Sequence, residues 1–192
     1  MAYHVKEYPN VLSSEFCRQV TEKFELDDRK HHGLTVDGYV RDIKDSMDLT
    51  LKPKDPAWKS DIKTFADSLH PYLDDYVDEF YKGQSRGYYN RPFQVDYRIQ
   101  RYTPDNLGYA WHNDYCFNEF GGQRQAVRII TIIWYLNTVD GGTTEFFDGT
   151  HVKPEEGKLL LFPSTWCHAH KANPPIGGNK YICTGLLYTS FE

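Results

Sequence analysis

The spacing of the hydrophobic residues changes once along this chain, and that change limits the folds open to it. In two segments before residue 80, apolar residues recur at steps of three and four, which is typical of amphipathic helices. From Gln94 onward they alternate with polar residues, as Val95, Tyr97 and Ile99 do, which predicts a half-buried strand. Helices followed by strands predict an α+β chain that is mainly β, with the helices on one outer face.

The first half of the chain is expected to hold two helices with a polar segment between them. The first helix begins near Ser13, whose hydroxyl can cap the free backbone N–H groups. The second is longer, and Pro71 is expected to bend or interrupt it. Segment 31–54 is expected to be irregular, and segments 33–50 and 85–91 are candidate lid loops. Further strands are expected at 127–136, 144–147, 159–162 and 181–188.

Length and composition narrow the class of protein. A chain of 192 residues is expected to form one domain with its own core. The net charge of −5 gives no broad basic surface, so nucleic acid is not the expected partner. Four scattered cysteines, the absence of an apolar signal segment and the absence of a membrane-length apolar run predict a soluble, cytoplasmic protein with no membrane partner. The oligomeric state is left open.

Three potential metal ligands and one basic residue stand out in the strand-rich half. His112 and Asp114 form a His-x-Asp pair, and residues i and i+2 of a strand point to the same side. A third ligand is available from His168 or His170, and Lys180 lies ten residues after His170. Two histidines and one carboxylate form a face that binds iron(II) and leaves positions open for a co-substrate and O2. The same ligands also suit a zinc hydrolase, so these residues alone leave the metal open.

Five sequence segments in a fixed order favour an iron(II) oxygenase over a zinc hydrolase, through a resemblance to a known family. They are Tyr102-Thr-Pro-Asp-Asn-Leu-Gly-Tyr109-Ala-Trp-His112-Asn-Asp114, Arg128-Ile-Ile-Thr131-Ile-Ile-Trp-Tyr135-Leu136-Asn137, Gly141-Gly142-Thr143-Thr144-Glu145-Phe146, Val152-x-Pro154-x-x-Gly157-x-x-x-x-Phe162 and His170-x-x-x-Pro174-Pro175-x-x-Gly178-x-Lys180. Through them, residues 102–188 resemble the catalytic core of the prolyl 4-hydroxylase branch of the iron(II)/2-oxoglutarate dioxygenases. The resemblance implies a double-stranded β-helix, or jelly roll, at residues 93–192, with residues 1–92 as helical support within one domain.

The same resemblance implies a ligand set for iron(II). It comprises His112, Asp114 and a distal histidine. The spacing to the basic residue favours His170 over His168 as that histidine. Ala172 departs from the family pattern, which often has glycine at this place, and the choice between the two histidines stays open on that account.

The resemblance also implies a co-substrate site and a substrate site. Lys180 is expected to bind the far carboxylate of 2-oxoglutarate, with Thr184, Tyr102 and Tyr135 close to it. The cofactors implied are Fe(II), 2-oxoglutarate and O2, with ascorbate as a further reductant. Arg128 and Trp134 are expected to contact the substrate.

The expected activity is hydroxylation of an aliphatic carbon, with release of succinate and CO2. The resemblance points to a prolyl residue in a peptide or protein as the substrate. A free amino acid or another small molecule is the alternative substrate, and a non-catalytic jelly roll that binds a ligand is the alternative function. The carboxylate of Asp114 favours hydroxylation over halogenation, because related halogenases place a halide there. A nucleic-acid demethylase is disfavoured by the neutral to acidic C-terminal segment.

Overall fold

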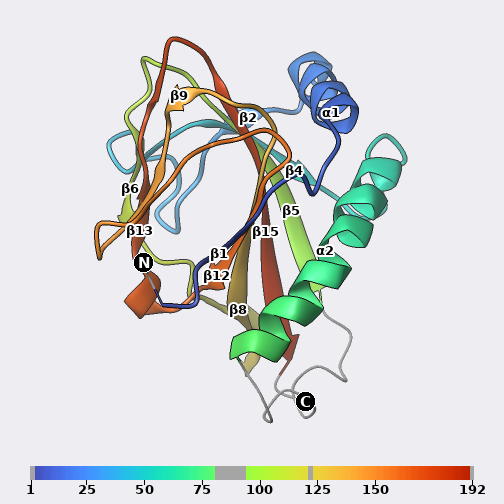
Figure 1. The fold of residues 1–192 in the computed structure, drawn as a ribbon, viewed down its shortest axis with the longest axis vertical. Coiled ribbons are helices and arrows are strands. Elements are labelled where there is room, and N and C mark those ends of the chain that lie inside the picture. The colour runs from blue at the N-terminus through green and yellow to red at the C-terminus, as the bar shows by residue number, and fades with distance from the viewer. Residues whose placement is uncertain (1–2, 81–93, 121–122, 191–192) are drawn as a thin grey trace.

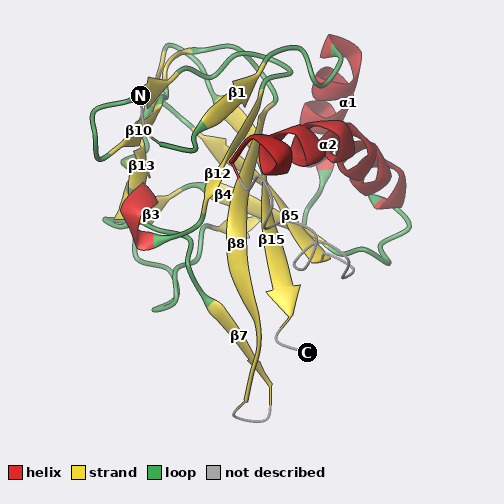
Figure 2. Ribbon diagram, turned by 60° about the horizontal axis from the view of Figure 1, so that its bottom comes forward, coloured by secondary structure: helices red, strands yellow, loops and turns green. Residues whose placement is uncertain are grey.

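The computed structural model describes residues 3–80, 94–120 and 123–190, which form two antiparallel sheets with two helices on one side (Figures 1 and 2). The larger sheet runs in the order β1 (Lys6–Tyr8), β12 (Leu159–Pro163), β8 (Gln123–Tyr135), β15 (Lys180–Ser190), β5 (Gln94–Tyr102), β4 (Met47–Leu51) and β2 (His31–His32), with β7 (Phe117–Phe120) paired to β8. The smaller sheet runs in the order β11 (His151–Val152), β10 (Thr144–Phe146), β13 (His170–Ala172), β6 (Gly108–His112) and β3 (Lys44–Asp45). A separate pair joins β14 (Pro175–Ile176) to β9 (Asp140–Gly141). The expected mainly β, α+β class is confirmed.

Helix α1 (Ser14–Leu26) begins where the sequence predicts. The side chain of Ser13 accepts the backbone N–H of Phe16 at 3.2 Å, which satisfies one of the free donors at the helix start. Val20 and Phe24 are fully buried on one face of the helix. This face packs on the larger sheet, so the helix is stabilised by burial of its apolar stripe.

Helix α2 (Lys59–Phe80) runs through Pro71 without interruption. Pro71 lies on the exposed face of the helix. Proline has no backbone N–H to donate to the carbonyl one turn earlier, and water can form that hydrogen bond instead. On the opposite face Phe65 is fully buried, and its ring lies 5.2 Å from that of Trp134 in the larger sheet. The helix is thus held by tertiary packing across the position where local propensity opposes it.

The strands alternate between two cores. On β5, Tyr97 and Ile99 face the helices and belong to the helix-side core. Tyr102, Tyr135 and Phe162 belong to a second core, which lies between the two sheets. This arrangement gives the larger sheet an apolar helix-facing side and leaves its other side toward the smaller sheet.

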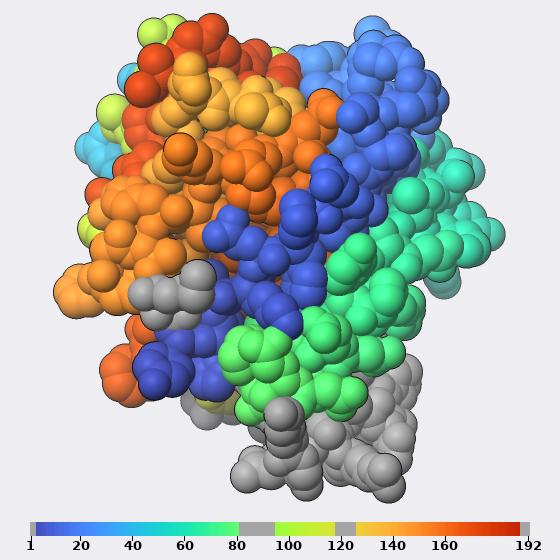
Figure 3. All heavy atoms as spheres, viewed as in Figure 1, coloured from blue at the N-terminus to red at the C-terminus, as the bar shows by residue number. Residues whose placement is uncertain are grey.

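The first half of the chain contains strands as well as helices. The prediction that segment 31–54 is irregular is therefore wrong in part. It contains β2, β3 and β4, and β4 pairs with β5 over its whole length. The N-terminal strand β1 pairs with β12, and Figure 3 shows its segment crossing the face beside α2. The candidate lid at 33–50 therefore includes strand, while the candidate lid at 85–91 lies outside the described residues.

Within the described part of the chain, neither helix combines the length and the apolar character that crossing a membrane requires.

Candidate active site

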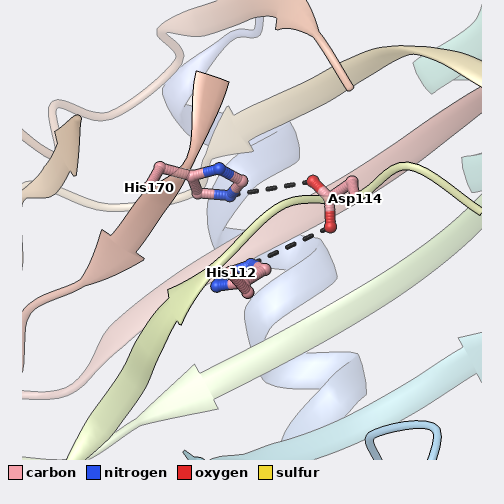
Figure 4. A group of neighbouring side chains, drawn as sticks. All are labelled: His112, Asp114 and His170. Carbon is pink, nitrogen blue, oxygen red and sulfur yellow. Dashed lines mark ion pairs between the residues drawn. The ribbon is translucent and has the colours of Figure 1, made fainter. Parts of the chain in front are cut away.

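Three side chains converge where β6 pairs with β13 in the smaller sheet. His112 ends β6 and His170 begins β13, and the two residues are direct partners across that antiparallel pair. Asp114 follows two residues after β6 and lies between the two imidazoles (Figure 4). Its carboxylate oxygens are 3.8 Å from Nε2 of His112 and 3.7 Å from Nε2 of His170. One ligand atom from each residue lies within 4.8 Å of the others, so the three can hold one metal ion.

Both imidazoles are held in the form that binds a metal. Nδ1 of His112 lies 2.8 Å from the carbonyl oxygen of Ala110, and Nδ1 of His170 lies 3.0 Å from that of His168. A carbonyl only accepts, so each Nδ1 carries the proton and donates it. In the neutral ring, Nε2 then carries the lone pair that can bind a metal.

The carboxylate is oriented by a second layer of hydroxyl groups. Thr131 on β8 donates its hydroxyl to Asp114 at 2.8 Å, and the buried Ser164 lies 2.9 Å from the same hydroxyl. Burial opposes the charge on Asp114, but His170, His112 and the Thr131 hydrogen bond outweigh it and lower the pKa of the carboxyl. Burial, assisted by His170, lowers the pKa of His112 to about 4. Near neutral pH the site therefore offers a neutral imidazole and a carboxylate, the forms that bind metal.

These donors fit iron(II). Two imidazole nitrogens and one carboxylate form the three-ligand face typical of non-haem iron oxygenases, and the remaining positions would face open space. That space is a cavity of about 600 Å³ between the sheets, lined by all three residues of the cluster. Its volume is in the range of pockets that bind small molecules.

The predicted co-substrate residues lie on the inner side of the larger sheet. Lys180 is 1% exposed, and its ammonium donates to the carbonyl of Gly142 at 2.8 Å and lies 4.7 Å from the centre of the Tyr102 ring. Burial lowers the pKa of Lys180 to about 7. The hydroxyl of Tyr135, fully buried, lies 2.7 Å from that of Thr144, which lines the cavity.

The remaining predicted residues divide between the two faces of the sheet. Thr184 and Arg128 line the cavity, and Arg128 also donates to the hydroxyl of Tyr188 at 2.8 Å. The expected substrate contact of Trp134 is wrong. Its side chain is fully buried in the helix-side core, where its indole N–H donates to Ser68 of α2 at 3.2 Å.

His168 points away from the cluster. It lies in a short 3-10 helix (Trp166–His168), and its Nε2 is 2.6 Å from the carbonyl oxygen of Tyr3. Its own carbonyl is the acceptor for His170. The structure thus brings His170, and not His168, next to His112 and Asp114.

Several residues near the site were missed from the sequence. Lys44, Arg98 and Gln100 line the cavity, and Asp48 lies behind them, fully buried. The apolar residues of β4 alternate with Asp48 and Thr50, which is a strand signal over five residues that could have been found. The meeting of Lys44 with Arg98 had no such local signal.

Comparison with known proteins agrees with this geometry. Residues 97–188 match the family described as the 2OG-Fe(II) oxygenase superfamily. No curated protein matches the sequence.

Solved structures match over nearly the whole chain. A viral collagen prolyl hydroxylase from Paramecium Bursaria Chlorella virus-1, in complex with 2OG, is 16% identical with a TM-score of 0.70 over 96% of both chains. A Pseudomonas putida prolyl-4-hydroxylase is 18% identical with a TM-score of 0.69, over 95% of this chain and 91% of that one. A Trichoplax adhaerens prolyl hydroxylase, in complex with a peptide fragment of the hypoxia inducible factor oxygen degradation domain, is 20% identical with a TM-score of 0.73, over 96% and 83%.

The chain has a jelly-roll fold, its resemblance to the prolyl 4-hydroxylases is confirmed, and residues 97–188 carry the match to the 2OG-Fe(II) oxygenase superfamily. The superfamily implies Fe(II), 2-oxoglutarate and O2 as cofactor and co-substrates.

Proposed function

We propose that this enzyme hydroxylates an aliphatic carbon of a prolyl residue in a peptide or protein and releases succinate and CO2. His112, Asp114 and His170 are the proposed iron ligands. The observation that carries the proposal is their convergence at the cavity, with both Nε2 atoms facing one carboxylate. Iron(II) bound there would couple the oxidative decarboxylation of 2-oxoglutarate to the oxidation of a C–H bond.

Lys180 is the proposed anchor for the far carboxylate of 2-oxoglutarate. Its ammonium is buried beside Tyr102 and Gly142, where an anion would restore the charge that burial disfavours. Tyr135 and Tyr102 are proposed to donate hydroxyl groups to that carboxylate, and Thr184, which lines the cavity, is proposed to border the rest of 2-oxoglutarate. Such donors orient the co-substrate and exclude water from it.

The prolyl substrate is proposed on two grounds. The chain shares its fold with three prolyl hydroxylases, one of them seen with a peptide fragment. Arg128 lines the cavity on the strand that also carries Thr131, and its charge helps to lower the pKa of Asp114. We propose that its guanidinium holds a carbonyl oxygen of the peptide so that the target carbon faces the metal.

A mass-spectrometric assay tests this function. Protein loaded with Fe(II) without oxygen is mixed with 2-oxoglutarate, air and a set of prolyl peptides, free proline and other amino acids, with and without ascorbate. Succinate release coupled to the gain of one oxygen atom on a prolyl peptide supports the proposal. Oxygen gain on a free amino acid alone would replace the peptide substrate with a small molecule. Failure to bind iron and to form succinate in every mixture would contradict the whole assignment.

A further inference from the structure

The wall of the cavity, taken over both sheets, carries more basic than acidic side chains. Among the described residues that line the cavity, the basic ones are Lys44, Lys52, Arg98 and Arg128, and the acidic ones are Asp96 and Asp114. Asp114 belongs to the metal cluster and would be neutralised by a bound cation. The whole chain has a net charge of −5, so the cationic wall is a local feature. A wall of this sign attracts an anionic group.

Arg98 is a basic residue of this wall that is partly exposed and has a distant acidic partner. Its side chain lines the cavity and is 38% exposed, and Nη1 forms an ion pair with Asp48 at 3.7 Å, which is longer than a hydrogen bond. Asp48 is already bonded by closer donors: Ser46 at 2.7 Å, Lys44 at 2.7 Å and Gln100 at 3.3 Å. Asp48 is therefore an ion-pair partner of Arg98 that makes its hydrogen bonds to other residues.

The buried network around Asp48 holds this wall rigid. Lys44 and Asp48 are 2% and 0% exposed and form an ion pair, and Gln100 also receives the Tyr102 hydroxyl at 3.3 Å. Gly33 covers the pair, and a Cβ at that position would lie 2.3 Å from the hydroxyl of Ser46. A charged pair buried this deeply costs desolvation energy, which a specific positioning role would justify.

We propose that Arg98 binds a carboxylate group of the substrate, which makes this enzyme selective for an acidic substrate. A guanidinium matches a carboxylate through two parallel N–H donors, and the half-open cavity wall leaves these donors available. This inference rests on the proposed hydroxylation of a prolyl substrate. In such a substrate the carboxylate comes either from an acidic side chain next to the proline or from the α-carboxylate of the free amino acid.

The far carboxylate of 2-oxoglutarate is assigned to Lys180, which is buried beside the cavity-lining Tyr102. Lys180 pairs with Tyr102 at one end of β15, whereas Arg98 pairs with Thr184, four residues further along. Four residues of strand separate the two backbone positions by roughly 13 Å. Arg98 and Lys180 are thus placed to hold two different anions.

Binding without turnover tests the proposal. The protein is loaded with Fe(II) and 2-oxoglutarate under nitrogen and titrated with pairs of probes that differ by one carboxylate. One set consists of blocked prolyl pentapeptides with glutamate or glutamine at each flanking position, and the other consists of L-proline and L-prolinamide. We expect one acidic probe to bind about 10- to 100-fold more tightly than its neutral counterpart, which is the range for a hydrogen bond to a charged group. Arg98→Gln should remove this difference and leave the affinity for 2-oxoglutarate unchanged.

Arg101→Gln is the matched control. Arg101 lies on the same strand but faces α1, where it bonds the carboxylate of Glu25 at 2.8 Å and 2.9 Å. Preference for acidic probes should survive in Arg101→Gln. The proposal is overturned if no pair is discriminated, if the preference survives in Arg98→Gln, or if Arg98→Gln weakens 2-oxoglutarate instead. Admitting air afterwards tests the reaction separately: an acidic probe that binds through Arg98 without gaining oxygen contradicts the prolyl function and leaves the carboxylate site standing.

Discussion

The two faces of the larger sheet carry different kinds of side chain on the same strands. Toward the helices, β5 and β15 present Tyr97, Ile99 and Cys183, each at most 5% exposed. Toward the cavity, the neighbouring positions present Arg98 and Thr184. Because successive residues of a strand point to opposite faces, each strand supplies stability with one half of its residues and chemistry with the other half.

This difference implies that stability and ligand binding respond separately to substitution. A change on the helix-facing side should lower the free energy of unfolding and leave the affinity of the folded protein for metal intact. A change on the cavity side should weaken ligand binding and have a smaller effect on the free energy of unfolding. Each prediction below compares the two quantities.

The largest effect is expected from Asp114→Ala. It removes a proposed iron ligand that faces both imidazoles, so iron affinity should fall by more than the roughly 10- to 100-fold that loss of an outer-layer partner costs. Hydroxylation should fall below detection. Anaerobic titration of Fe(II) measures the affinity, and urea unfolding of the metal-free protein checks that the fold persists. The exposed Asp105→Ala serves as control, and iron binding retained at the native level in Asp114→Ala would refute the ligand assignment.

Trp134→Ala should destabilise the helix-facing side of the larger sheet. Its ring is fully buried against Phe65 and Tyr97, so its loss should lower the free energy of unfolding by about 3–5 kcal/mol. Urea unfolding measures this loss. The fraction that stays folded should bind iron and 2-oxoglutarate with native affinity. A selective loss of substrate binding without loss of stability would show that Trp134 contributes to the site. It would contradict the division of the sheet into a stabilising face and a binding face.

Thr131→Val tests the second layer on the cavity side. Valine keeps the shape of threonine but cannot donate to Asp114, whose carboxylate would lose its fixed orientation. Iron affinity should fall by about 10- to 100-fold, with a smaller change in stability. Thr131→Ser keeps the hydroxyl and should recover most of the affinity. Equal iron affinities in the valine and serine variants would show that the hydroxyl does not position the ligand.

The sequence predicted the faces of the sheet where the alternation was clear and failed where it was not. On β5, polar and apolar residues alternate, and the structure places Tyr97 and Ile99 toward the helices as expected. In β8 the run around Trp134 and Tyr135 is apolar on both sides, because both faces are buried there. Two adjacent strand residues cannot share a face, so the expectation that both of these lie at the site contradicted the strand period itself.

The cavity wall shows a different limit. Lys44 on β3 and Arg98 on β5 are far apart in sequence, and both lie near Asp48 of β4, the strand that pairs with β5. Nothing in either local pattern specifies that pairing. The His-x-Asp pair could be predicted because both ligands lie two residues apart in one segment. His170 could be predicted because its spacing to Lys180 is also short in sequence.

The most gradual effect, up to about 1.4 kcal/mol per pH unit, is expected from the titration of Lys180. Burial lowers its pKa from 10.5 to about 7 in the folded protein without ligands. Above pH 7 the unfolded chain therefore holds a proton that the folded protein has lost. The free energy of unfolding should accordingly rise with pH between about 7 and about 10.5, by up to that amount per unit. Lys180→Met should abolish this rise, and the difference between the two proteins isolates the lysine from other titrating groups.

Binding of 2-oxoglutarate should follow the same titration with the opposite sign. The charged ammonium is the form that attracts the far carboxylate, so the dissociation constant should stay level below pH 7 and rise about 10-fold per unit above it. Isothermal titration in two buffers of different ionisation enthalpy would detect the uptake of a proton on binding at pH 8. Lys180→Arg stays charged throughout and should bind without proton uptake. A wild-type dissociation constant that is independent of pH from 6 to 9 would show that Lys180 does not anchor the co-substrate, and the cationic wall at Arg98 would then become the candidate anchor.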